Sequence, residues 1–307
     1  MDYDKLIDDE IRAFIDRTNS YYPADAVTRT ISEQRQVYDA MCRAFFQGYP
    51  EGVGVTDITA DGVPCRLYSA GDPSVTVVYF HGGGFVVGGL DSHDDVCAEL
   101  CQQTGYRVLS VDYRLAPEHK HPAAFDDAFA ATAWAAGQFP EPIVLAGDSA
   151  GGNLAAAVAH HARGRLKGIL GQVLIYPGLG FDPDSASMHD HAEAPLLTRE
   201  EVLFYRTIRT GGGLPKDDPT FAPLDDSDFG DLPPTVIFTA DCDPIRDDGP
   251  RYRDRLRAAG VPVEWINEEG LVHGYLRARA SSERARHSFE RISLAIEALG
   301  QGIWPYG

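Results

Sequence analysis

Short apolar runs alternate with amphipathic stretches along most of the chain. The apolar runs are nearly continuous and rich in β-branched residues, a pattern typical of strands buried on both faces of a sheet. They lie at 75–80, 107–113, 143–147, 171–177, 235–240 and 261–266. Helical spacing of apolar residues predicts helices at about 92–104, 123–137, 149–163, 246–259 and 281–299. The alternation predicts an α/β fold, with a mostly parallel sheet flanked by helices.

The N-terminal part departs from this rhythm. Residues 2–17 and 31–47 have apolar positions at helical spacing and read as two amphipathic helices. Residues 54–71 form two β-like runs joined at an Asp-Gly pair, which predicts a hairpin. We expect that hairpin to supply the antiparallel edge of the sheet.

A long interval between two predicted strands also breaks the pattern. Residues 178–234 are rich in Pro, Gly and Asp and contain one clear helix, near 199–209. A plain crossover does not need that length, so we interpret the interval as an insertion that joins the N-terminal helices in a cap. The predicted organisation is N-terminal cap helices, first core part, cap insertion and second core part, at 1–50, 51–177, 178–234 and 235–307.

Composition narrows the possible partners. The 307 residues include 27 Lys and Arg against 46 Asp and Glu, giving a net charge of −19. This charge repels phosphate backbones and anionic membrane surfaces, so neither nucleic acid nor a membrane is an expected partner. The acidic N-terminus lacks the apolar run of a signal peptide, and no stretch approaches the ~18 apolar residues of a membrane span. We therefore expect a cytoplasmic protein.

One serine lies where the pattern changes from strand to helix. The segment GDSAG at 147–151 fits G-x-S-x-G, in which a tight turn exposes the serine and the neighbouring positions must be small. The following helix points its first amides at negative charge developing there. Alone, such a match is more often a helix N-cap. The apolar strand before Ser149 and the alanine-rich helix after it favour a nucleophile.

A serine nucleophile needs a base, and the base needs an acid. In this type of fold they follow in the order Ser, acid, His, at the ends of later strands. His273 follows the strand predicted at 261–266. The candidate acids follow the strand predicted at 235–240, and they are Asp241, Asp243, Asp247 and Asp248.

A glycine-rich loop provides a third element. HGGGF at 81–85 comes directly after a predicted buried strand. Consecutive glycines let backbone amides approach a ligand closely, as an oxyanion hole requires. A merely flexible loop is the alternative, but flexibility alone does not explain the adjacent histidine and the buried strand.

Taken together, the motifs resemble those of a known family. HGGG, YRLAPEH, GDSAGG, LIYPGL, DPIRDDG and VHGY occur in this order between about residues 75 and 275. They are similar to the motifs of the hormone-sensitive-lipase-like family of bacterial α/β-hydrolase esterases, and GDSAG to those of one main subgroup. The resemblance implies an α/β-hydrolase fold with a mostly parallel eight-stranded sheet, flanking helices and a helical cap.

The resemblance also implies roles for individual residues. Ser149 would be the nucleophile, His273 the general base and Asp243 the acid, with Asp241 and Asp247 as competing candidates. The expected oxyanion-hole donors are the amides of Gly83, Gly84 and Ala150, and we expect His81 and Asp148 to support the loop and the turn. Two departures, Tyr275 where the family usually has Phe and KHPAA after APEH, lie outside the chemistry.

The implied function is that of a carboxylesterase acting on short- to medium-chain esters, without metal or organic cofactor, as a monomer or homodimer. The cap varies within the family, so the resemblance says least about the substrate. Two alternatives use the same scaffold. The first is another acyl hydrolase, such as an arylformamidase or a carbohydrate deacetylase. The second is a non-catalytic small-molecule receptor, which the histidine of VHGY argues against.

Overall fold

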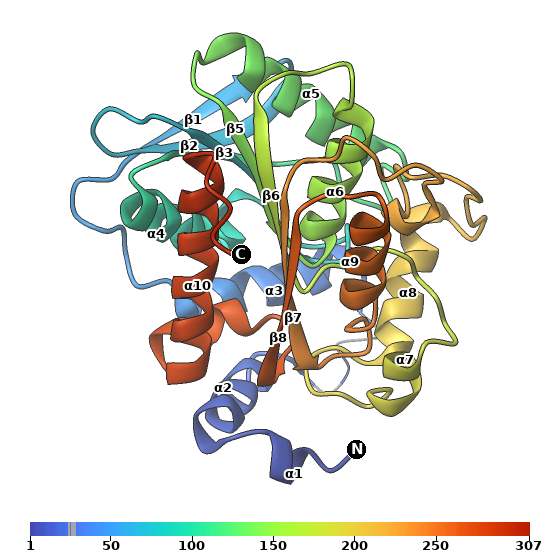
Figure 1. Cartoon of the computed structure of the whole chain (residues 1–307). Helices are drawn as coiled ribbons and strands as arrows, with labels where there is room; N and C mark the ends of the chain where they lie inside the picture. Colours follow the sequence, from blue (N-terminus) through green and yellow to red (C-terminus); the bar gives the residue numbers. More distant parts are fainter. Residues whose placement is uncertain (24, 26–28) are drawn as a thin grey trace.

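The computed structural model describes residues 1–23, 25 and 29–307. Within these residues, eight strands form one sheet in the order β1-β2-β4-β3-β5-β6-β7-β8 (Figure 1). The pairs β1–β2 and β2–β4 are antiparallel and all other neighbours are parallel. The predicted fold class is therefore confirmed, with the hairpin at one edge. The strands are β1 Gly54–Ala60, β2 Val63–Ser69, β3 Thr76–Phe80, β4 Arg107–Val111, β5 Ile143–Asp148, β6 Ile169–Ile175, β7 Thr235–Cys242 and β8 Val263–Val272.

The helices agree with the predicted ranges, with one correction. The expected single helix over 2–17 is two, because Ile7 is extended and the Asp8 side chain caps a new helix by accepting from the Ile11 amide at 2.9 Å. A short additional helix, α7, lies in the insertion. The α-helices are α1 Tyr3–Leu6, α2 Asp9–Asn19, α3 Ile31–Phe45, α4 Asp94–Thr104, α5 Ala123–Gln138, α6 Ala150–Ala162, α7 Ala186–Asp190, α8 Arg199–Thr210, α9 Asp248–Ala258 and α10 Glu283–Gly300. The described residues also form the 3₁₀ segments η2 Leu90–Ser92, η3 Pro223–Asp225 and the six-residue η4 Tyr275–Ala280.

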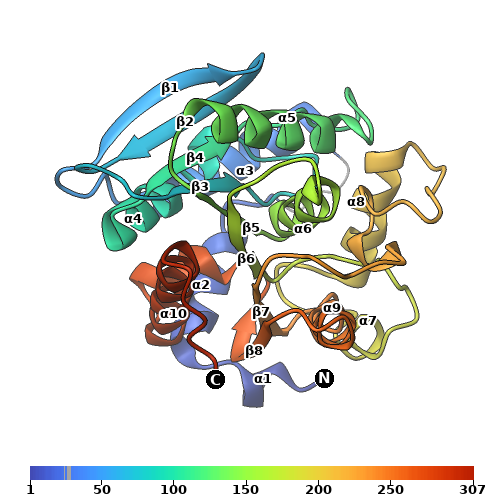
Figure 2. The ribbon, with the colours of Figure 1, turned by 45° about the horizontal axis from the view of Figure 1, so that its top comes forward.

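Two hydrophobic cores lie on opposite faces of the sheet. Helices α4 and α10 cover one face, and α5, α6 and α9 cover the other (Figures 1 and 2). Strand β3 shows the alternation: Val77 and Tyr79 belong to the first core, and Val78 and Phe80 to the second. Every residue of β3 is buried. This central strand therefore holds the following loop rigidly at the carboxyl edge of the sheet.

Strand β8 is longer than predicted and carries an irregularity. It pairs with β7 from Val263 onward, but the register shifts between the pair Ala240↔Glu268 and the pair Cys242↔Val272. Because Cys242 and Val272 are neighbours, the residues that follow them leave the sheet side by side. Those residues are Asp243 and His273.

The N-terminal helices and the insertion approach the same edge of the sheet. Side chains of α2, α3 and α8 line a cavity that also contains Ser149. The predicted boundaries of the cap, at 50, 177 and 234, stay a prediction. Among the described residues, no helix combines the length and the apolar character needed to cross a membrane.

Candidate active site

Ser149 occupies a strained turn between β5 and α6. Its backbone has φ 54° and ψ −116°, which is uncommon for a residue with a side chain. The surrounding chain leaves no room for side chains, since a Cβ on Gly151 would overlap the carbonyl oxygen of Phe80 and one on Gly147 would lie 2.7 Å from it. The Ser149 amide donates to the Ile175 carbonyl at 2.8 Å. These contacts fix the serine at the end of β5.

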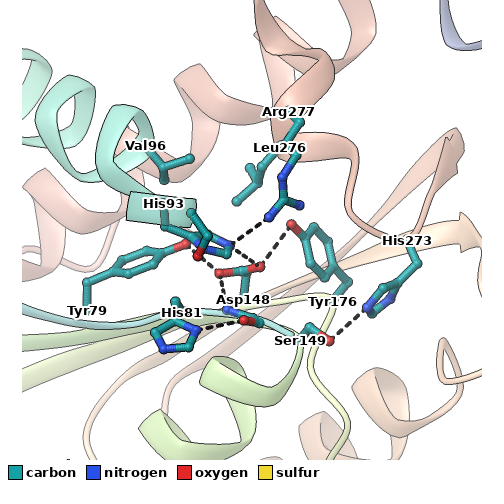
Figure 3. A network of polar contacts seen from close by, with 12 residues as sticks. Tyr79, His81, His93, Val96, Asp148, Ser149, Tyr176, His273, Leu276 and Arg277 are labelled. Carbon is teal, nitrogen blue, oxygen red and sulfur yellow. Dashed lines mark hydrogen bonds and ion pairs between the residues drawn. The ribbon is translucent and has the colours of Figure 1, made fainter. Parts of the chain in front are cut away.

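The structure brings three predicted side chains into one line. His273 Nε2 lies 2.8 Å from Ser149 Oγ (Figure 3). Its Nδ1 lies 2.7 Å from Asp243 Oδ2. Asp243 is fully buried, and its other oxygen accepts the Ile245 amide at 3.0 Å. The geometry is that of a nucleophile, a base and an orienting acid.

The other carboxylates after β7 are engaged elsewhere. Asp241 accepts from an asparagine side chain of β8 at 2.9 Å. Asp247 accepts from an amide in α7 at 2.8 Å, and Asp248 from two amides of the 179–180 turn. Burial raises the pKa of Asp248 to about 6. Of the four candidates, only Asp243 contacts His273 within the described structure.

Three backbone amides near Ser149 can receive an oxyanion. Gly83 and Gly84 have φ of 122° and 61°, and a Cβ on Gly84 would lie 2.6 Å from the Tyr205 ring. Ala150 is the first residue of α6, so its amide is one of the free donors of a helix N-terminus. In the described part of the chain, none of these three amides donates a hydrogen bond to another residue.

Asp148 joins the serine turn to the glycine loop. One oxygen accepts from the Tyr79 hydroxyl at 2.8 Å and the Gly82 amide at 3.0 Å. The other lies 3.2 Å from His93 Nε2 and accepts the Tyr176 hydroxyl at 3.3 Å (Figure 3). Gly82 directly precedes Gly83, the first of the predicted oxyanion-hole residues. Asp148 therefore sets the position of that loop relative to the nucleophile.

The electrostatics around Asp148 keep it ionised. Burial opposes its negative charge, but the charge and hydrogen bond of His93, followed by the charge of Arg277, lower the pKa of the carboxyl below its usual value. Arg277 Nη2 lies 3.5 Å from His93 Nε2 and donates to the Tyr38 hydroxyl at 2.7 Å. The arginine therefore acts as a nearby counter-charge without a direct ion pair to Asp148.

His81 lies beneath the glycine loop. Its Nδ1 is 2.7 Å from the Gly82 carbonyl oxygen, and its ring stacks on Tyr113 at a centroid distance of 4.2 Å. Burial, followed by the charge of His93, lowers the pKa of His81 to about 3, so the ring is neutral. This placement fits a bracing role for the loop, and that role stays a prediction.

A comparison with known families identifies the scaffold. A family model described as alpha/beta hydrolase fold matches residues 77–277, which include every residue of the site described so far except Tyr38. The chain belongs to the α/β-hydrolase family.

Individual relatives show to which group within this family the α/β hydrolase belongs. Esterase LipI of Mycobacterium tuberculosis is 45% identical over 235 residues, which cover 74% of this chain and 73% of LipI. Carboxylesterase NlhH of the same organism is 42% identical over 265 residues, covering 81% of this chain and 78% of NlhH. A crystal structure of an esterase from the bacterial hormone-sensitive lipase family matches with a TM-score of 0.87 and 25% identity, covering 95% of this chain and 98% of that one. The predicted membership of the hormone-sensitive-lipase-like family is confirmed.

Sequence reasoning missed part of this α/β hydrolase's site. Tyr79 and Tyr176 come from β3 and from the end of β6, the two neighbours of β5 in the sheet. His93 and Arg277 are 184 residues apart and belong to no strand. No local signal in the sequence predicts that they meet.

Two adjoining cavities open at the site. The inner cavity, of about 390 Å³, contains Ser149, His273 and Arg277. The outer cavity, of about 480 Å³, contains Phe204 and Glu200. Both are lined by Val87, Tyr22, Tyr38, Glu201 and Tyr205.

Proposed function

We propose that this carboxylic ester hydrolase acts on short- to medium-chain esters through a covalent acyl-enzyme formed on Ser149. The observation that carries the proposal is the line from Ser149 Oγ through His273 to Asp243, with distances of 2.8 and 2.7 Å. The relatives named esterase and carboxylesterase support ester hydrolysis. The residues described above supply the steps.

In the first step, Ser149 Oγ attacks the ester carbonyl carbon while His273 Nε2 accepts the hydroxyl proton. The Asp243 carboxylate holds the ring by its Nδ1–H and stabilises the imidazolium that forms. Asp243 is fully buried, which strengthens this interaction because little water screens it.

The tetrahedral intermediate places its oxyanion among the amides of Gly83, Gly84 and Ala150. Each such donor typically contributes about 3 kcal/mol to the transition state. His273 then protonates the leaving alcohol, and the acyl group remains on Ser149. Water, deprotonated by His273, attacks the acyl-enzyme in the same way and releases the acid.

The dimensions of the inner cavity support compact acyl groups. Its volume of about 390 Å³ lies near the lower end of small-molecule sites, which span roughly 300–1,000 Å³. Residues of α2, α3 and α8 line it, so a long acyl chain would extend beyond it into the adjoining cavities.

The test is a series of p-nitrophenyl esters from acetate to palmitate, with wild type and Ser149→Ala. We expect turnover to be greatest for short and medium chains and to be lost in Ser149→Ala. Asp243→Asn should lower kcat about 10⁴-fold, whereas the matched Asp241→Asn variant, at the same strand end, should keep most of it. Absence of hydrolysis across the series, with activity instead on aryl formamides or acetylated sugars, would favour another acyl hydrolase. No turnover of any of these, and no labelling of Ser149 by an organophosphonate, would contradict the proposal.

A further inference from the structure

The outer cavity lies where the part of an ester remote from the reacting carbonyl would extend. It is separate from the nucleophile but shares its inner wall with the cavity that contains Ser149. A group bonded to the ester oxygen or to the acyl chain that extends from the inner into the outer cavity passes Tyr22, Tyr205 and Glu201. The side chains that line the outer cavity therefore determine which chemical group of the ester can bind there.

Aromatic rings form a large part of the outer walls. They belong to Tyr22, Tyr38, Phe204 and Tyr205, from three segments of the chain. Phe204 and Tyr205 meet edge to face at a centroid distance of 5.5 Å, and Phe204 is 37% exposed. Exposed ring faces of this kind attract cations through their negative quadrupole, most strongly where several rings converge.

The charged groups of the outer cavity have one sign. Glu200 and Glu201 line it, and among the described residues no Lys, Arg or His does. Glu201 uses Oε2 to accept from the amide and hydroxyl of Thr198, each at 2.8 Å. The described residues of the outer cavity therefore offer it no Lys, Arg or His partner. Burial, followed by the charge of Glu201, raises the pKa of Tyr205 to about 12, which agrees with a negative field at this wall.

The nearby cation Arg277 lines the inner cavity and not the outer one. Its guanidinium lies 5.2 Å from the centroid of the Tyr38 ring and donates to the Tyr38 hydroxyl, so that ring already has a cation beside it. The charged groups that line the outer cavity among the described residues are Glu200 and Glu201. The net charge of −19 adds to the effect, because it draws cations towards the surface and repels anions.

We propose that the outer cavity is a subsite for an ammonium group, and that the enzyme prefers esters bearing a protonated amine or a quaternary ammonium. The rings of Tyr22, Phe204 and Tyr205 contact the cation, and Glu201 supplies the opposite charge. This inference rests on the proposed ester hydrolysis at Ser149.

The experiment compares two esters of nearly the same shape. Butyrylcholine carries a quaternary nitrogen, and 3,3-dimethylbutyl butyrate carries a neutral carbon in its place. The measured quantity is the ratio of their kcat/KM values in wild type and variants, which cancels the intrinsic difference in reactivity between the esters. Glu201→Gln should lower the ratio about fivefold to tenfold, and Phe204→Leu about threefold. Glutamine at this position retains the helix cap, and Phe204 lies at the surface, so both variants should fold.

Glu290→Gln is the matched control, because it removes one negative charge from the exposed face of α10 and should leave the ratio unchanged. If Glu201→Gln and Phe204→Leu hydrolyse both esters with the wild-type ratio, the cation subsite is refuted while ester hydrolysis stands. If Glu290→Gln lowers the kcat/KM ratio by the same factor, the preference comes from the overall charge of the protein, and the subsite is refuted. If wild type hydrolyses neither these esters nor p-nitrophenyl butyrate, the proposed function fails together with this inference.

Discussion

Replacing Asp148 by asparagine tests whether one buried carboxylate holds the nucleophile turn and the oxyanion loop together. The wild-type side chain offers two acceptor oxygens to donors from Tyr79, Gly82, His93 and Tyr176. Asparagine keeps one oxygen and replaces the other with an NH₂ group, which cannot accept a hydrogen bond. The amide oxygen can still serve Tyr79 and Gly82, so the pair of contacts to His93 and Tyr176 is lost.

The size of the effect follows from these contacts. A hydrogen bond to a charged group contributes about 1.5–3 kcal/mol, so losing two reduces the free energy of unfolding by about 3–6 kcal/mol. The variant also removes the counter-charge of Arg277, which acts in the same direction. For a chain of this size, about 2 °C is lost per kcal/mol, so Tm should fall by about 6–12 °C. Because Gly82 adjoins Gly83, the first proposed oxyanion donor, kcat should fall by up to about 100-fold.

The assay combines thermal unfolding followed by circular dichroism with hydrolysis of p-nitrophenyl butyrate at 25 °C. Tyr176→Phe is the graded control, since it removes a single donor at 3.3 Å and should cost about 1 kcal/mol. If Asp148→Asn melts within about 1 °C of wild type and keeps its kcat, the network does not position the loop.

The remaining predictions concern strain, burial and close packing. Ser149→Gly should be inactive like Ser149→Ala but more stable than it by about 1 kcal/mol in urea unfolding, because glycine adopts φ 54° without strain; equal stabilities would argue against strain at the turn. Burial lowers the pKa of His81 to about 3 and of His160 to about 4, so the unfolded chain takes up these protons first. Stability should therefore be full above about pH 6.5 and fall towards pH 4, by at most about 1.4 kcal/mol per group and pH unit; urea unfolding at pH 7.5 and 5.0 with unchanged midpoints would contradict this. Gly151→Ala should fail to accumulate as folded protein, because its Cβ overlaps the Phe80 carbonyl, and a normal melting curve would disprove that packing.

Much of the fold was accessible from the sequence, because strands buried on both faces must be apolar throughout. Strands β3 to β7 therefore lie within a few residues of their predicted ranges. The same criterion does not detect the end of β8. This edge strand has half-exposed positions, and its residues 267–269 are polar, so the apolar run stops early. The break between α1 and α2 depends on a single capping aspartate within an otherwise helical pattern.

Part of the candidate site could likewise be predicted from the sequence, and part could not. The positions of Ser149, Asp243 and His273 relative to strand ends follow from local motifs and the order of strands. The surroundings of Asp148 do not, because His93 and Arg277 reach it from segments that only the tertiary fold brings together. The wall of the outer cavity is likewise a product of packing between α3, α8 and Tyr22.

The shifted register between β7 and β8 has a consequence for how this enzyme can vary. Ala240 pairs with Glu268, and Cys242 with Val272, so three residues of β8 lie opposite a single residue of β7. In an unbroken ladder the residue level with Asp243 would be Leu271, and the two extra residues advance His273 to that place. Removing two residues from this stretch would leave an unbroken ladder with the imidazole still level with Asp243, and removing one would leave an ordinary bulge of two residues opposite one. The extra length of β8 can therefore be shortened without moving His273 away from its acid.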